Sequence, residues 1–273
     1  MTRLRLLALL NAITLLAGVG ALVFGDFSHH HKRVVAIAAP TTLPPTTAAP
    51  TTEPPTTAAA PPPPCSGAPP QTDGRESEVA QANGPRVEIF DSRGGSKPTR
   101  SMANPQAEGA PLTFLVQDDQ GDWLKVLLPV RPNGSTGWIQ RSQVTVTRHD
   151  YRIFVELSNH CITVFKGTSV FDREPVGVGT SNTPTPGGLY YLTVLFQPPD
   201  PNGAYGPYAY ELSGFSDVLP NFEGGNGNLG IHGTNEPQAI GTDVSHGCIR
   251  MSNAGITRLA GTLPLGVPVE VVA

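Results

Sequence analysis

The sequence predicts a mostly β protein in four parts: a membrane helix, an extended linker and two β-rich domains. Residues 6–25 are apolar apart from Asn11 and Thr14, and residues 39–64 consist almost entirely of Ala, Pro and Thr. From residue 85 onward, short runs of β-branched and aromatic residues alternate with Gly, Asn, Asp and Pro clusters, as strands and turns do. The predicted boundaries are 1–25, 26–84, 85–147 and 148–273.

The apolar run near the N-terminus is long enough to cross a bilayer as a helix, and Arg3 and Arg5 precede it. A cleaved signal peptide usually has a shorter apolar core of about 7–15 residues, with a small-residue site directly after it. The AIA sequence at 36–38 lies beyond a charged HHHKR stretch. We therefore expect residues 1–25 to remain as an anchor in the plasma membrane, with the rest of the chain in the extracytoplasmic cell envelope. Cleavage is the alternative.

The segment 39–64 is the centre of a predicted disordered linker that covers residues 26–84. Only Leu43 and Glu53 in the segment are not Ala, Pro or Thr, so burial cannot repay the entropy lost on folding. Its prolines favour extended polyproline II at about 3.1 Å per residue, which allows a tether of up to about 80 Å.

Charge and cysteine content limit the function classes. The net charge of -4 and the pI of about 6.0 give no general attraction for nucleic acid, so we exclude that class of partner. Three cysteines in an exported chain form at most one internal disulfide. If Cys248 is reactive, that disulfide joins Cys65 to Cys161; the alternative is two unrelated thiols.

Residues 85–147 contain the runs RVEIF, LTFLV, WLKVLLPV and GWIQ, a layout typical of a small all-β barrel or sandwich. Trp123 and Trp138 fit either the core of this domain or a binding platform. The order of the runs, which end in LPVRPNGSTGWI, resembles the bacterial SH3-like modules that accompany cell-wall enzymes.

Residues 148–273 are predicted to form a mostly antiparallel β-sandwich or barrel with one or two short helices. YRIFVEL and CITVFKG are joined by a short turn in which Asn159 tolerates the required conformation. REPVGVGT, GLYYLTVLF, NLGIHG and the alternating VPVEVV are further strand candidates. SNAGITRLAG is the best helix candidate, with Ser252 or Asn253 at its start and Gly261 at its end.

The segment GIHGTNEPQAIGTDVSHGCIRM carries the candidate chemistry, and Cys248 has three interpretations. With His232 and His246 it could bind zinc, although the usual ligand spacing is missing. It could also be a small buried hydrophobe. As a nucleophile it gains from Gly247, which allows a tight turn that aims the amides of Gly247 and Cys248 at one bound carbonyl oxygen, an oxyanion hole.

A nucleophilic cysteine needs a base, because a thiol with a pKa near ~8.5 is mostly protonated at neutral pH. His246 lies two residues before Cys248, but Gly247 can bend the chain between them. His232 is followed by Gly233, whose carbonyl can accept one ring N–H and fix the tautomer. We expect His232 to be the base and His246 to add orientation or a hydrogen bond; the reverse assignment is the alternative.

The stretch IHGTNEPQAIGTDVSHGCIRM resembles the active-site signature of the YkuD-type L,D-transpeptidases: a His-Gly pair, a gap, then Ser/Thr-His-Gly-Cys, an apolar residue and Arg. TPTPGG at 183–188 is similar to a turn of that family, although Gly188 and Leu189 stand where Thr and Phe are more usual. The similarity covers about residues 150–273. It implies Cys248 as nucleophile, His232 as base, the Gly233 carbonyl as third member, and Ser245, His246 and Gly247 around the oxyanion site.

The resemblance also implies an activity: transfer of peptidoglycan tetrapeptide stems into 3→3 cross-links, with release of D-alanine, no metal or other cofactor, and carbapenem-type β-lactams as inhibitors. Arg250 could hold a substrate carboxylate or a structural ion pair. Tyr208, like Tyr210, could line the cleft or pack in the core. The alternatives to transpeptidation are L,D-carboxypeptidase trimming of stems and a non-catalytic scaffold that binds the cell wall.

Overall fold

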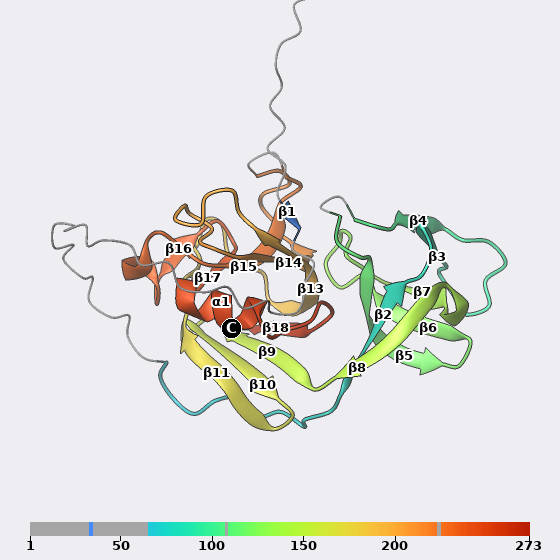
Figure 1. Cartoon of the computed structure of the whole chain (residues 1–273), viewed down its shortest axis with the longest axis horizontal. Coiled ribbons are helices and arrows are strands. Elements are labelled where there is room, and N and C mark those ends of the chain that lie inside the picture. Colours follow the sequence, from blue (N-terminus) through green and yellow to red (C-terminus); the bar gives the residue numbers. More distant parts are fainter. Residues whose placement is uncertain (1–32, 35–64, 107–108, 223–224) are drawn as a thin grey trace, which may run out of the picture. The chain divides into compact units, whose positions relative to one another are not determined.

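The computed structural model describes residues 33–34, 65–106, 109–222 and 225–273 (Figure 1). The chain divides into two compact units, 1–31 and 32–273, and every described residue belongs to the second. The predicted anchor and most of the predicted linker lie outside the described residues. No helix among the described residues is both long and apolar enough to span a membrane.

The first group of strands forms a five-stranded antiparallel sheet in the order β7-β6-β5-β2-β8, with β3 and β4 paired separately. Its elements are β2 (Ser77–Ala82), β3 (Arg86–Ile89), β4 (Arg100–Ala103), β5 (Thr113–Gln120), β6 (Trp123–Leu127), β7 (Thr136–Gln140), the 3-10 turn η1 (Arg141–Gln143) and β8 (Val144–His149). Its core includes the fully buried Leu112, Phe114 and Leu124. Trp123 and Trp138 are only half-buried.

The range that we assigned to the linker was too long at its C-terminal end. Ser77–Ala82 forms β2, which pairs with β5 on one side and β8 on the other. Val79 and Ala80 are buried in this central strand. The short SEVAQA run contains little apolar surface of its own, and its strand conformation depends on hydrogen bonds to two distant neighbours.

The second group forms a sheet in the order β11-β10-β9-β18-β13-β14-β15-β17, and β1 (Arg33–Val34) pairs with β13. Its elements are β9 (Tyr151–Glu156), β10 (Cys161–Lys166), β11 (Ser169–Pro175), β13 (Gly188–Gln197), β14 (Ala209–Phe215), β15 (Asn228–His232), β17 (Ile249–Arg250) and β18 (Pro268–Val272). The short strands β12 (Val178–Gly179) and β16 (Asp243–Ser245) pair in parallel, and η2 (Pro237–Ala239) is a 3-10 turn. The mostly β prediction is confirmed.

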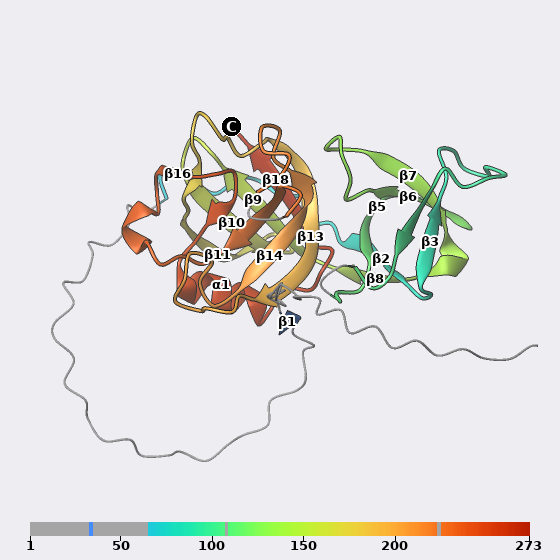
Figure 2. The same ribbon diagram turned by 90° about the horizontal axis from the view of Figure 1, so that it is seen from above.

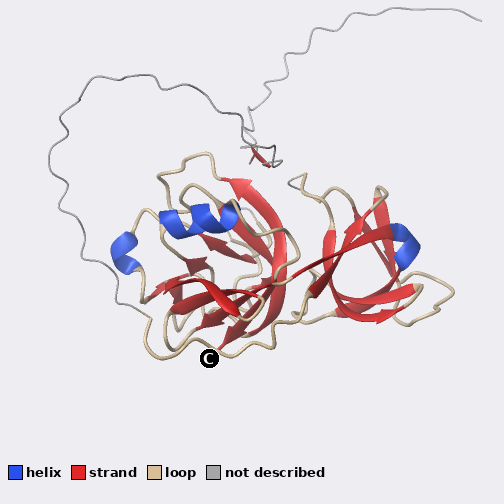
Figure 3. Ribbon diagram, turned by 60° about the horizontal axis from the view of Figure 1, so that its bottom comes forward, coloured by secondary structure: helices blue, strands red, loops and turns tan. Residues whose placement is uncertain are grey.

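The helix α1 (Asn253–Ala260) packs against this sheet, as Figure 3 shows in blue. Ser252 caps its start by accepting a hydrogen bond from the amide of Gly255, as predicted. Ile256 and Leu259 bury their side chains in one core with those of β13, β15 and β18, which Figure 1 labels; Figure 2 shows β13, β18 and α1 from above. The helix follows β17 in sequence. It covers the part of the sheet that carries the candidate site.

One predicted turn differs by a residue. Between β9 and β10 the left-handed conformation falls on His160, with φ of 48°, and not on Asn159. The side-chain amide of Asn159 instead donates to the carboxylate of Glu156. Nε2 of His160 lies 2.8 Å from the carboxylate of Asp243 on β16. The turn is therefore set by side-chain contacts that local sequence preference does not include.

A disulfide joins Cys65 to Cys161, the pairing that the sequence left open, across a sequence separation of 96 with Cα atoms 5.5 Å apart. Cys161 is fully buried at the start of β10. The guanidinium of Arg173 donates to the carbonyls of Ser66 and Gly67. Residues 65–67 are thereby fixed on the β10–β11 hairpin.

Cys65→Ser should lower the free energy of unfolding by about 2–4 kcal/mol, because the disulfide restricts a long loop in the unfolded chain. Urea denaturation of the oxidised wild type and the variant measures the difference. Adding a reductant should destabilise the wild type and leave the variant unchanged. Equal unfolding free energies without reductant would contradict a stabilising role.

Candidate active site

Parallel pairing of β15 with β17 brings His232 and Cys248 together. Ile231 and Ile249 are register partners in this pair. Alternate residues of a strand face the same side, so the ring of His232 projects from the face of β15 that Gly230 leaves bare. The Sγ of Cys248 lies over that bare position, 3.8 Å from where a Cβ on Gly230 would stand. Both Cys248 and His232 line one pocket.

The ring of His232 is buried, with 4% of its surface exposed, and its orientation is defined. Nδ1 donates to the carbonyl of Gly233 at 2.6 Å, which leaves the lone pair on Nε2. The ring of Tyr205 packs against it with centroids 4.7 Å apart. Burial lowers the pKa of His232 to about 4, and the charge of Arg250 acts in the same direction, while the Gly233 carbonyl opposes the shift. The imidazole is therefore neutral at pH 7 and able to accept a proton.

The segment before Cys248 is held in a turn by Ser245. The buried Ser245 hydroxyl donates to the Cys248 carbonyl at 2.5 Å and accepts from the Gly247 amide at 3.0 Å. Gly247 has a φ of +117°, which disfavours any residue with a side chain. Two expectations need correction here. Ser245 shapes the turn and is too buried to bind substrate, and the Gly247 amide, expected in the oxyanion hole, already donates to Ser245.

His246 lies apart from the pair formed by Cys248 and His232. It is exposed, and its ring stacks on Phe222 with centroids 5.0 Å apart and an interplanar angle of 33°. Phe222 lines the pocket, whereas His246 is not among the described lining residues. The geometry therefore favours His232 over His246 as the histidine next to the sulfur.

Two expected substrate contacts have structural partners instead. Arg250 donates to the carboxylate of Glu236 at 3.0 Å, so the ion-pair alternative describes it. Tyr208 is half-buried against the core, and its carbonyl accepts from the amide of Gly233. Neither residue lines the pocket. Tyr210 is buried, and its hydroxyl donates to backbone carbonyls at the C-terminal end of α1 and in the segment that follows.

The pocket has a volume of about 230 Å³, and the side chains that line it include several that were not anticipated, among them Tyr205, Glu211 and Phe222. Glu211 is the only acidic side chain among the described lining residues, and no Lys or Arg is among them. It is the register partner of Gly230, so it faces the same side as the sulfur. Strand alternation in AYELSGF could have indicated Glu211. Tyr205 and Phe222 lie in irregular segments and carry no such signal.

Zinc binding finds no support in the described part of the chain. No three His, Cys, Asp or Glu side chains there are grouped so that they could hold a metal ion. His246 stacks on Phe222 while His232 is buried beside Tyr205, which separates two of the three ligands that a zinc site would need.

Part of the chain is similar to known proteins. Residues 150–271 match the YkuD family model, an L,D-transpeptidase catalytic domain. The YkuD proteins of Bacillus licheniformis and Bacillus subtilis are each 34% identical over 121 residues, which is 44% of this chain and 65% of each relative. The solved L,D-transpeptidase 3 of Mycobacterium tuberculosis, with a faropenem-derived adduct, has 18% identity and a TM-score of 0.38 over 53% of this chain and 76% of that one.

Residues 150–271 are thus similar to L,D-transpeptidase catalytic domains of the YkuD type. The chain spans less than two thirds of the length of the two Bacillus relatives, 65% of each.

The buried neutral state of His232 predicts a pH dependence of stability. Its pKa is near 6.5 in the unfolded chain and about 4 in the folded one, so the unfolded chain binds more protons between these values. The free energy of unfolding should therefore fall as pH falls from 6.5 to 4, by about 3 kcal/mol from this residue. Chemical denaturation of the wild type and His232→Gln across this range isolates the effect.

The His232→Gln variant removes only the contribution of His232 to the pH dependence of the unfolding free energy. His149, whose pKa burial also lowers, contributes equally to both proteins and cancels in the difference. A difference in unfolding free energy that is constant from pH 7 to pH 4 would mean that His232 is not buried in the neutral state.

Proposed function

We propose that this protein is a peptidoglycan L,D-transpeptidase that forms 3→3 cross-links through an acyl-enzyme on Cys248. The observation that carries the proposal is the pocket that Cys248 and His232 share. The sulfur lies over Gly230, and the imidazole beside it keeps its lone pair on Nε2 because Nδ1 is bound to the Gly233 carbonyl.

In the first half-reaction the thiol of Cys248 gives its proton to Nε2 of His232. The sulfur attacks the carbonyl carbon of the third residue of a tetrapeptide stem, and the bond to the terminal D-alanine breaks. The proton on His232 passes to the departing amine, and a thioester remains. The protonated ring would be unstable in its buried site by itself, and the negative sulfur offsets that cost while the two charges coexist.

An oxyanion forms at the attacked carbonyl and needs a hydrogen-bond donor. Since the amide of Gly247 is bound to Ser245, we assign this role to the amide of Cys248, whose position the Ser245 turn defines. Loss of one such donor typically costs about 10²–10³ in rate. Ser245 acts on the reaction only by holding this turn.

In the second half-reaction the side-chain amine of a neighbouring stem gives a proton to His232 and attacks the thioester carbon. Cys248 leaves as a thiolate and recovers its proton from the ring. The carboxylate of Glu211 can attract the ammonium form of the acceptor into the pocket. Water in place of the amine would give an L,D-carboxypeptidase, the second outcome that this chemistry allows.

The predicted location supports the same substrate. An apolar run at residues 6–25 with a basic start favours a membrane anchor, and the Pro/Thr-rich segment favours an extended tether. We propose that the catalytic domain works in the cell envelope, where peptidoglycan stems are within reach of the tether.

Incubation with a carbapenem should add the mass of one inhibitor to the wild type and nothing to Cys248→Ala, because the thioester forms on this sulfur. His232→Gln should slow acylation by about 10²–10⁴, the usual effect of losing a general base. His246→Gln, which alters an exposed histidine on the other side of Phe222, should change the rate by less than tenfold. Intact-mass spectrometry over time measures all four proteins.

The outcomes separate the candidate functions. An equal adduct on Cys248→Ala would reject the nucleophile, and near wild-type acylation of His232→Gln would reject the base. Tetrapeptide supplied with an acceptor stem should give a cross-linked product and D-alanine. D-alanine release without a cross-link would favour the carboxypeptidase. If neither D-alanine nor a cross-linked product formed, the non-catalytic scaffold would be the remaining alternative.

A further inference from the structure

One wall of the catalytic pocket belongs to the β14–β15 loop, the connection of residues 216–227 between the two strands. Phe222, Gly225, Asn226 and Gly227 of this loop line the pocket together with Cys248 and His232. The amide of Ser216 donates to the carbonyl of Gly227 at 2.8 Å, which joins the two ends of the loop. A contact that fixes the two ends of the loop therefore also restrains the pocket wall that the loop forms.

A residue of the first sheet supplies such a contact. Arg131 lies between β6 and β7, and its Nη1 donates to the Ser216 carbonyl at 2.7 Å. Its Nη2 donates to the carbonyl of Asn226 at 3.1 Å and to that of Leu219 at 3.4 Å. One guanidinium therefore joins the outgoing and the returning ends of the loop, a geometry that needs its planar fork of donors.

The same connection in the first sheet holds the end of β14. The side-chain amide of Asn133 donates to the Phe215 carbonyl at 2.8 Å and accepts from the Phe215 amide at 2.9 Å, as a neighbouring strand would. The guanidinium carbon of Arg131 also lies 4.8 Å from the centre of the Phe215 ring. The side chains of Arg131 and Asn133 thus fix both the end of β14 and the ends of the loop that follows it.

We propose that Arg131 and Asn133 are positioning residues for the catalytic pocket, through which the first sheet sets the shape of the substrate-binding wall. The inference concerns the pocket of the proposed transpeptidase and rests on that function for its kinetic effect. Neither side chain lines the pocket or contacts the reacting sulfur. Without them the loop would have to be ordered by the substrate, and that entropy cost appears as weaker binding.

The physical reason predicts a specific kinetic pattern. The wall contacts substrate, whereas the reactivity of Cys248 depends on His232 and the Ser245 turn, which Arg131 does not touch. Loss of Arg131 should therefore raise KM and leave the chemical step nearly unchanged. A merely structural role would instead lower the amount of folded protein and reduce every activity in the same proportion.

The test uses the full chain with Arg131→Met, which removes the donors and keeps most of the apolar length. KM for tetrapeptide, measured by D-alanine release, should rise about five- to tenfold, with kcat and the rate of Cys248 alkylation by iodoacetamide within about twofold of wild type. Arg131→Lys, which keeps the charge and loses the fork, should restore part of the KM. Asn133→Ala should change KM in the same direction as Arg131→Met.

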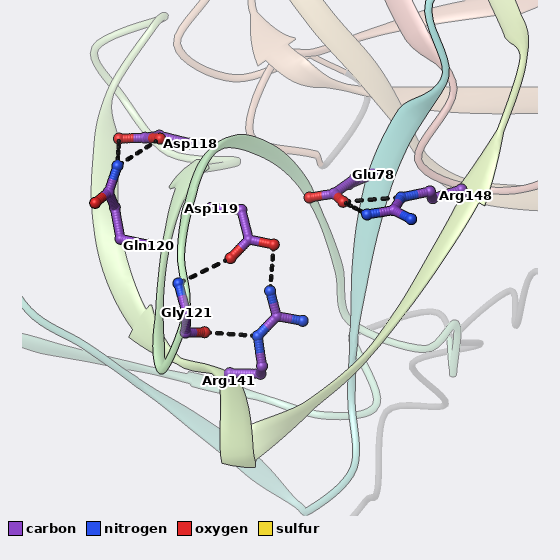
Figure 4. Close-up of polar contacts among 7 residues, drawn as sticks. All are labelled: Glu78, Asp118, Asp119, Gln120, Gly121, Arg141 and Arg148. Atoms are coloured by element: carbon purple, nitrogen blue, oxygen red, sulfur yellow. Dashed lines mark hydrogen bonds and ion pairs between the residues drawn. The ribbon is translucent and has the colours of Figure 1, made fainter.

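Arg141→Met is the matched control. Arg141 also belongs to the first sheet, where it donates to the carbonyl of Gly121 at 2.6 Å and to the carboxylate of Asp119 (Figure 4). These contacts stay within the first group of strands and do not involve the β14–β15 loop. This variant should therefore keep the wild-type KM even if its thermal stability falls.

A second readout does not depend on the reaction. The Ser216 amide should exchange its hydrogen at least tenfold faster in Arg131→Met than in wild type, and at the wild-type rate in Arg141→Met. An unchanged KM, equal effects of the two arginine variants, or unchanged Ser216 exchange would overturn the proposal. If the wild type released no D-alanine, the proposed function would fail, and Ser216 exchange would still test the coupling.

Discussion

Parallel pairing of β15 with β17 is the contact on which the candidate site depends. It joins residues from two separate stretches of the chain, and the amide of Met251 donates to the carbonyl of His232 just beyond the paired residues. The Asn253 side chain then accepts from the amide of Thr234, which ties α1 to the segment that follows β15. Backbone pairing thus places the two segments side by side, while the Ser245 hydroxyl and the His232 side-chain contacts orient the turn and the ring.

Within this frame, small residues and buried hydroxyls determine what the reactive groups can do. Gly230 has no side chain where the sulfur lies, and Gly247 takes a backbone conformation that brings its amide to Ser245. Burial keeps His232 neutral, and Gly233 selects the ring nitrogen that faces the pocket. In open solvent the same imidazole would turn freely and would not be held neutral by burial.

Local patterns predicted the β-rich class and the capped helix α1, because each has a signal within a few residues. The choice of His232 as the partner of Cys248 came instead from two separated motifs and a family resemblance. The same patterns missed β2, whose short SEVAQA run becomes a central strand only through β5 and β8. They also left the role of Arg250 open between substrate and an ion pair, and that of Tyr208 between the cleft and the core, since Glu236 and the core contacts arise from folding. Contacts between the two sheets, such as those of Arg131, have no local signature.

The disulfide has a mechanical consequence. Residue 65 is covalently attached to the buried start of β10, in the sheet that also carries the candidate site. A pull on the chain preceding Cys65 would therefore enter the catalytic sheet directly through a covalent bond. The five-stranded sheet that follows in sequence would bear none of that tension, so its contacts with the β14–β15 loop would persist under strain on the tether.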